Sequence, residues 1–89
     1  MKSPIVVNMR SGCDYDIKIC RPSKWGNPFI IGKDGNRDRV ILKYRTYLQM
    51  KTSLLKDIHE LEGKVLGCWC KPKACHGDVL VEFVRQEAK

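Results

Sequence analysis

The stretch KVLGCWC, residues 64–70, decides the fold, because it carries the strongest strand signal in the chain. The turn residues KPKA at 71–74 end this strand. Apolar residues at helical spacing then follow over residues 77–86. The sequence therefore predicts a strand, a turn and a final helix in its last third.

A helical pattern precedes this unit. Apolar residues recur at i, i+3 and i+4 spacing over residues 40–61, and Gly63 is suited to the position after a helix. Asn36 is a good N-cap for the helix start. The polar stretch KTS at 51–53 lies inside the pattern. The pattern therefore predicts either one long helix or two, with the threonine or the serine of KTS capping the second.

Three short segments nearer the N-terminus have strand character. Residues 5–8 begin with three β-branched apolar residues, residues 16–20 alternate weakly, and residues 29–32 form a short apolar run before a turn. Strands that alternate with helices indicate an α/β fold. We therefore expect one α/β domain over residues 1–89, with a three- to four-stranded, at least partly parallel sheet and flanking helices.

Composition excludes several classes of protein. The chain has 89 residues, of which 43% are hydrophobic and 30% charged, so it is neither disordered nor fibrous. Its apolar runs, such as 5–7 and 79–81, are far shorter than the roughly 20 residues of a membrane span. No signal-peptide core follows the N-terminus. Five cysteines without an export signal then indicate reduced thiols and a cytoplasmic protein with no membrane partner.

The chain is strongly basic, with 17 Lys and Arg against 10 Asp and Glu, a formal net charge of +7. Such a charge favours polyanionic partners, namely nucleic acid, nucleotides or acidic protein surfaces. The alternative is that the charge serves solubility alone.

Basic residues gather on the segments that would leave the carboxyl ends of the strands, where ligands bind in open parallel sheets. These segments are 8–13, 21–29 and 71–78, and their only acid is Asp78. Their basic side chains are Arg10, Arg21, Lys24, Lys71, Lys73 and His76. This asymmetry predicts an anion-binding mouth.

The segment RPSKWGNPF at 21–29 is the main candidate for ligand binding. Arginine binds phosphate through two parallel hydrogen bonds, tryptophan stacks on bases, and asparagine can pair with a base edge or a ribose. In the alternative interpretation, its two aromatic residues belong to the core beneath the loop. The predicted ligand-binding set is Asn8, Arg10, Arg21, Ser23, Lys24, Trp25, Asn27 and Lys71.

Four candidate metal ligands fall within nine residues, and they are Cys68, Cys70, Cys75 and His76. Zinc prefers four nitrogen or sulfur donors in a tetrahedron, and a closed site would stabilise a thin core. However, structural zinc sites usually space the first two cysteines two to four residues apart, whereas here one residue separates them. In the alternative interpretation, the first two are buried strand cysteines.

The same region offers a candidate catalytic set, Cys75, His76 and Asp78. A helix N-terminus lowers a thiol pKa, so Cys75 is a candidate nucleophile and His76 its base. Asp78 is either a general acid or base or a first-turn partner of the helix dipole.

Four segments match one family together: VNMR at 7–10, RPSKWGNPF at 21–29, GCWCKP at 67–72 and CHGDVL at 75–80. On these segments the chain resembles the small bacterial and phage family catalogued as domain of unknown function 4326. The resemblance implies a compact α/β domain and carries over no catalytic residue, because the family's activity is not settled. Where the family usually has glycine before the second segment, this chain has Cys20, whose side chain would narrow a site at the backbone.

The sequence thus supports a nucleotide- or nucleoside-binding α/β domain of Rossmann-like type that takes a phosphorylated ligand and acts on nucleotides or modified bases. One alternative is a non-catalytic, phage-encoded basic module that binds nucleic acid or a host protein. A zinc-stapled structural domain, with zinc as its cofactor, is the other.

Overall fold

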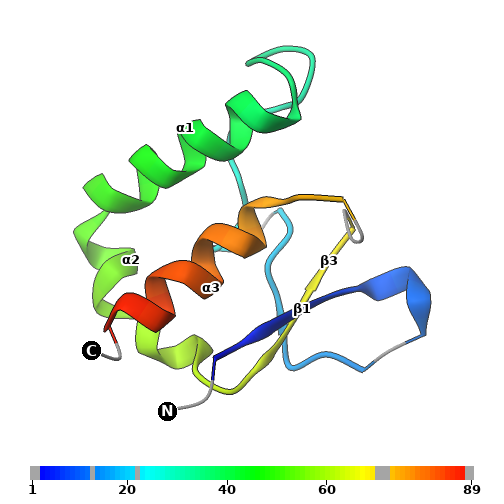
Figure 1. Cartoon of the computed structure of the whole chain (residues 1–89), viewed down its shortest axis with the longest axis vertical. Coiled ribbons are helices and arrows are strands. Elements are labelled where there is room, and N and C mark those ends of the chain that lie inside the picture. Colours follow the sequence, from blue (N-terminus) through cyan, green and yellow to red (C-terminus); the bar gives the residue numbers. More distant parts are fainter. Residues whose placement is uncertain (1–2, 13, 22, 70–72, 88–89) are drawn as a thin grey trace.

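A computed structural model describes residues 3–12, 14–21, 23–69 and 73–87 (Figure 1). The elements in chain order are β1 (Ile5–Asn8), the 3-10 turn η1 (Met9–Ser11), β2 (Ile17–Lys18), α1 (Arg37–Met50), α2 (Thr52–Lys56), the 3-10 turn η2 (Ile58–Leu61), β3 (Val65–Cys68) and α3 (His76–Glu87).

The three strands form one parallel sheet in the order β1-β3-β2, so the stretch KVLGCWC supplies the central strand. Ile5 of β1 lies opposite Val65, and Ile17 of β2 lies opposite Leu66. The predicted α/β class and parallel sheet are confirmed. The finer Rossmann-like assignment stays a prediction.

The strand predicted at residues 29–32 does not form. Instead, the backbone closes local turns, in which the Gly32 N–H donates to the Gly35 carbonyl and Asp34 exchanges hydrogen bonds with Ile30. Gly32 and Gly35 have positive φ angles of 94° and 133°, which L-residues with a side chain rarely adopt. Turn chemistry therefore outweighs the β propensity of the two isoleucines.

The helices begin and end largely where the sequence predicts. The Asn36 side-chain oxygen accepts the Arg39 backbone N–H at 2.9 Å, which confirms the cap. The pattern divides at Lys51 into α1 and α2, as the two-helix alternative predicts, but α2 ends at Lys56 and the last part of the pattern forms the 3-10 turn η2 instead. Lys51 itself is the N-cap of α2, without a side-chain cap hydrogen bond, so the predicted threonine or serine cap is wrong. Gly63 follows η2 with a φ of 66°.

The two long helices pack against each other, and α3 also packs against β1 (Figure 1). An ion pair between Arg45 and Glu82 joins α1 to α3. At Gly77 the first turn of α3 comes so close to the sheet that an added Cβ would lie 2.8 Å from Ile19 Cδ1 and 3.0 Å from Val6 Cγ2. The start of α3 is therefore held against the sheet.

The core between helices and sheet is apolar and nearly fully buried, and its largest side chains include Tyr44, Leu48, Ile58, Leu61, Leu66 and Leu80. Within the described ranges, none of the helices has the length and apolar character that crossing a membrane requires.

Candidate ligand pocket

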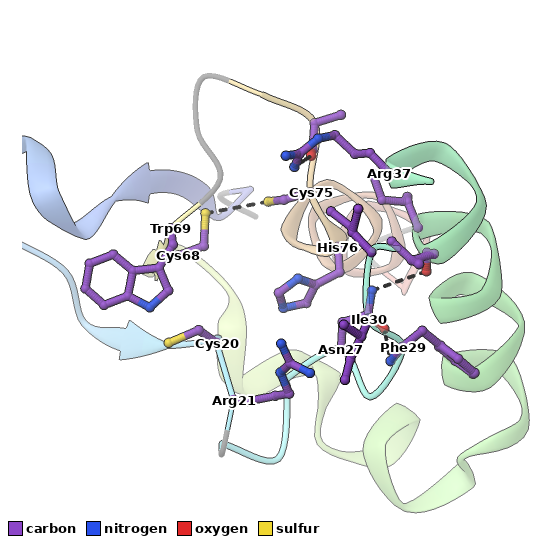
Figure 2. Close-up of a pocket in the computed structure, with 14 residues that line it drawn as sticks. Cys20, Arg21, Asn27, Phe29, Ile30, Arg37, Cys68, Trp69, Cys75 and His76 are labelled. Atoms are coloured by element: carbon purple, nitrogen blue, oxygen red, sulfur yellow. Dashed lines mark hydrogen bonds between the residues drawn. The ribbon is translucent and has the colours of Figure 1, made fainter. Parts of the chain in front are cut away.

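A pocket of about 310 Å³ lies where the segments after β2 and β3 meet the first residues of α1 and α3 (Figure 2). Its lining is Cys20, Arg21, Asn27, Phe29, Ile30, Ile31, Arg37, Val40, Ile41, Cys68, Trp69, Ala74, Cys75 and His76. Segments 21–29 and 71–78 therefore meet, as expected for loops at the carboxyl ends of parallel strands. Of segment 8–13, the described residues 8–12 do not contribute to the lining.

Two arginines supply the charge of the pocket. Arg21 follows β2 and is exposed. Arg37 is the first residue of α1, and its Nη1 donates to the Ala74 carbonyl at 3.0 Å. This bond connects the starts of α1 and α3 across the pocket.

Sequence reasoning missed Arg37 as a site residue, although a signal was present. A cation in the first turn of a helix interacts unfavourably with the helix dipole. An arginine at this position therefore indicates a role other than helix stabilisation, such as ligand binding. Trp69, which was also missed, is an aromatic residue directly after β3 and is 50% exposed. Figure 2 shows its indole at the rim, on the side of Cys20.

Asn27 shapes the loop that forms one wall of the pocket. Its Nδ2 donates to the Val40 carbonyl at 3.2 Å, and its Oδ1 accepts the Phe29 backbone N–H at 2.9 Å. These bonds fix the loop to α1, so the amide has a structural role besides lining the pocket.

The thiols of Cys68 and Cys75 lie 3.6 Å apart, and both side chains are buried. Burial, and next the nearby Cys68 thiol, raise the pKa of Cys75, while a hydrogen bond from the Gly77 backbone opposes the rise. The expected lowering of this pKa by the helix start is therefore wrong, because loss of hydration outweighs the helix end. Cys75 is a neutral thiol at neutral pH and a poor nucleophile.

His76 is buried and directed away from the thiol pair. Its Nε2 lies 2.8 Å from the Ile19 carbonyl oxygen, and since a carbonyl only accepts, this nitrogen carries the proton. Its ring also packs edge-on against Tyr44, with 4.9 Å between ring centroids. Burial lowers the pKa of His76, so the ring is neutral at neutral pH.

Asp78 caps the start of α3. Its Oδ2 accepts the Cys75 backbone N–H at 3.1 Å, the arrangement of a capping box, and it does not line the pocket. The first-turn interpretation of Asp78 thus describes its geometry. Cys75, His76 and Asp78 are neighbours in sequence whose side chains point in different directions, and their catalytic roles stay predictions.

The N-terminal candidates lie beside the pocket. The Asn8 side chain accepts the Arg10 backbone N–H at 2.8 Å and donates to the Trp69 carbonyl at 3.2 Å, so it caps η1 and ties it to β3. The Arg10 guanidinium lies over the Trp69 ring, 5.1 Å from its centroid. These residues position the rim without lining the pocket.

Three candidates from the RPSKWGNPF segment lie elsewhere. Lys24 pairs with Asp57 at 3.0 Å and Glu60 at 3.1 Å, so it faces η2. Trp25 is only 2% exposed and belongs to the core, as the alternative interpretation holds. The buried hydroxyl of Ser23 has no hydrogen-bond partner among the described residues.

The predicted zinc ligands are only partly placed. Cys68 and Cys75 come together, whereas the His76 ring is not grouped with them. Among the residues that the structure describes, no three histidine, cysteine or acidic side chains are grouped as a metal site. Cys70 and Lys71 lie outside the described residues, so the four-ligand site stays a prediction.

Comparison with known proteins shows that the chain is similar to a family without an assigned activity. The family model described as domain of unknown function DUF4326 matches residues 7–86. An uncharacterized 12.4 kDa protein from the nrdA-td intergenic region of Enterobacteria phage T4 is 37% identical over 78 residues, which cover 82% of this chain and 70% of that protein. Uncharacterized protein R718 of Acanthamoeba polyphaga mimivirus is 38% identical over 71 residues, 71% of this chain and 54% of that protein. No solved structure matches.

Proposed function

We propose that this chain, which belongs to the family described as domain of unknown function DUF4326, binds a nucleoside or a mononucleotide in the pocket. The observation that carries the proposal is that two arginines, Arg21 and Arg37, line a pocket whose other lining residues are largely apolar.

The charge of the lining favours an anionic ligand. No carboxylate is among the lining residues that the structure describes, so nothing there offsets the two guanidinium groups. Arginine matches the geometry of phosphate oxygens, and its hydrogen bonds to an ionised partner are stronger than neutral ones.

The apolar part of the lining fits a flat ring. The lining includes four apolar side chains, Phe29, Ile30, Ile31 and Ile41, and Trp69 is half exposed at the rim. A base gains stability by stacking on an aromatic face or by leaving water for such a surface.

The volume supports a small ligand. About 310 Å³ lies at the lower end of the roughly 300–1,000 Å³ found for small-molecule sites. A nucleoside or a mononucleotide is therefore a better match than a dinucleotide cofactor.

Binding without nucleophilic catalysis is the form of the proposal that the chemistry favours. Cys75 is protonated, and His76 is neutral with its proton committed to the Ile19 carbonyl. Cys75 would therefore not serve as an activated nucleophile in the expected activity on nucleotides or modified bases. Three of the described cysteines are free thiols, which suits a reducing compartment such as the cytoplasm.

Calorimetric titration with the ribonucleoside 5′-monophosphates and their nucleosides tests the proposal. A charged hydrogen bond contributes about 1.5–3 kcal/mol, so Arg21→Ala and Arg37→Ala should each weaken monophosphate binding about 10- to 100-fold. Arg85→Ala, which removes one charge from an exposed site on α3, should change it little. Equal losses in all three variants, or none in the first two, would refute the pocket as the phosphate site.

The second candidate is a non-catalytic basic module, phage-encoded in origin, that binds nucleic acid or a host protein. The observation behind it is the +7 charge, together with basic residues along the outside of α1, where Arg39, Lys43 and Lys51 line a second hollow. Nucleic-acid binding would weaken steeply with salt, whereas binding of a mononucleotide in a pocket depends on salt much less. A steep salt slope that Arg39→Ala and Lys43→Ala reduce would favour this candidate.

A further inference from the structure

Two buried thiols from separate elements face each other inside the pocket. Cys68 is the last residue of β3, and Cys75 directly precedes α3. Their sulfur atoms are 3.6 Å apart, and both residues line the pocket wall (Figure 2).

The sulfur separation matches the edge of a zinc tetrahedron. Two zinc–sulfur bonds of about 2.3 Å at the tetrahedral angle place the sulfurs about 3.8 Å apart. The observed 3.6 Å needs only a small movement to reach this value. A disulfide requires sulfur atoms about 2.05 Å apart, so the pair would have to move much further to form one.

The backbone of Cys75 is held in place at the start of α3. Asp78 holds the Cys75 backbone N–H, so the residue that presents the sulfur is itself fixed. The pair is therefore arranged before any ion arrives.

We propose that Cys68 and Cys75 are two thiolate ligands of a tetrahedral zinc site that opens into the pocket. His76 is not assigned as a ligand, because among the described residues its ring is not grouped with the two thiols. The remaining positions on the ion take donors from the pocket side, as water or as an atom of a bound ligand. Such an open site differs from the closed four-ligand site considered from the sequence, in which Cys68 and Cys70 are spaced more closely than is usual for structural zinc.

Zinc binding here is a ligand exchange without redox change. Each thiol releases one proton to solvent, and each sulfur donates an electron pair to Zn²⁺ in place of a zinc-bound water. The two thiolate charges balance the ion, so it adds no net charge beside Arg21 and Arg37. This inference does not depend on the proposed nucleotide binding.

The first test titrates reduced, chelator-treated protein with Zn²⁺ in competition with a chromophoric chelator, and in parallel with Co²⁺. We expect one equivalent of zinc and a thiolate-to-cobalt charge-transfer band. Cys68→Ser and Cys75→Ser should each weaken zinc binding at least about tenfold. Cys20→Ser, the matched control, changes a buried thiol that lines the same pocket and should leave zinc binding unchanged. Absence of zinc binding, or equal loss in all three variants, would overturn the site.

The second test uses the unaltered chain, so a variant that fails to fold cannot confuse the result. Alkylation by iodoacetamide is followed at each cysteine by peptide mass spectrometry, with and without one equivalent of Zn²⁺. Zinc should slow labelling of Cys68 and Cys75 at least about tenfold while Cys20 labels at its former rate. Unchanged labelling of the pair in the zinc-loaded protein would refute the proposal. Monophosphate titration of the zinc-free protein keeps this outcome separate from the proposed function.

Discussion

Replacement of Tyr44 by phenylalanine removes a single buried hydrogen bond that connects α1 to the pocket loop. The Tyr44 hydroxyl donates to the Trp25 carbonyl at 2.8 Å, and the side chain is fully buried. Burial raises the pKa of Tyr44, so the hydroxyl keeps its proton and stays a donor at any ordinary pH. The bond therefore contributes under all working conditions.

The cost of Tyr44→Phe follows from what the change leaves behind. The ring and its packing remain, so no large cavity forms. A hydrogen bond contributes about 0.5–1.5 kcal/mol, and leaving a buried acceptor without its partner costs about 1–3 kcal/mol. We expect a loss of about 1–2 kcal/mol in the free energy of unfolding, because the Trp25 carbonyl also interacts with His76. In a chain of 60–100 residues this lowers Tm by roughly 4–16 °C.

Thermal and urea unfolding, followed by circular dichroism, measure this loss. Tyr15→Phe is the matched control, because Tyr15 is 45% exposed and loses only a surface hydroxyl. Its stability should stay within about 0.5 kcal/mol of the parent. A Tyr44→Phe protein as stable as the Tyr15→Phe control would show that the bond to Trp25 does not hold the loop.

Two further changes test other parts of the fold. Asn36→Ala removes the side-chain acceptor of the Arg39 N–H and should cost about 0.5–2 kcal/mol, measured by urea unfolding; an unchanged midpoint would contradict the cap. For His76, burial holds the folded pKa below 6.5, so the unfolded chain binds more protons under that pH. Stability should therefore be highest above pH 6.5 and fall as the pH drops towards the folded pKa. Urea midpoints measured at about pH 7.5 and 5.5 should show this fall in stability. The control His59→Gln, which changes an exposed residue, should show the same fall, whereas His76→Gln should not.

The sequence predicted those parts of the fold that local chemistry determines. Asn36 caps α1, Gly63 follows η2 with positive φ, and β3 forms where β-branched and apolar residues meet turns. The run at 29–32 misled because its isoleucines have strand propensity while the glycines around Asp34 close a turn. Both the turn and the strand propensity depend on only a few residues, and propensity alone does not show whether a turn or a strand forms.

The candidate site was predictable in place but only partly in composition. Parallel strands bring their carboxyl ends together, so Arg21 and Asn27 meet the start of α3 as expected. The burial of Trp25 and the ion pairs of Lys24 depend on which side of a nine-residue loop faces the core, and no periodicity encodes that in an irregular segment. The pKa of Cys75 depends on burial, which the helix-start argument did not include.

The strand order has a consequence for how the chain folds. Because β3 lies between β1 and β2, these two strands do not pair with each other, and each must wait for residues 65–68. Pairing Ile5 with Val65 closes a loop of 60 residues, counted as 65 minus 5, before any ladder bond of that pair forms. Such long-range closure is entropically costly and slows folding relative to helix formation. A fragment that ends before Val65 would therefore form helical turns at most, and sheet and pocket would arise together in one late step.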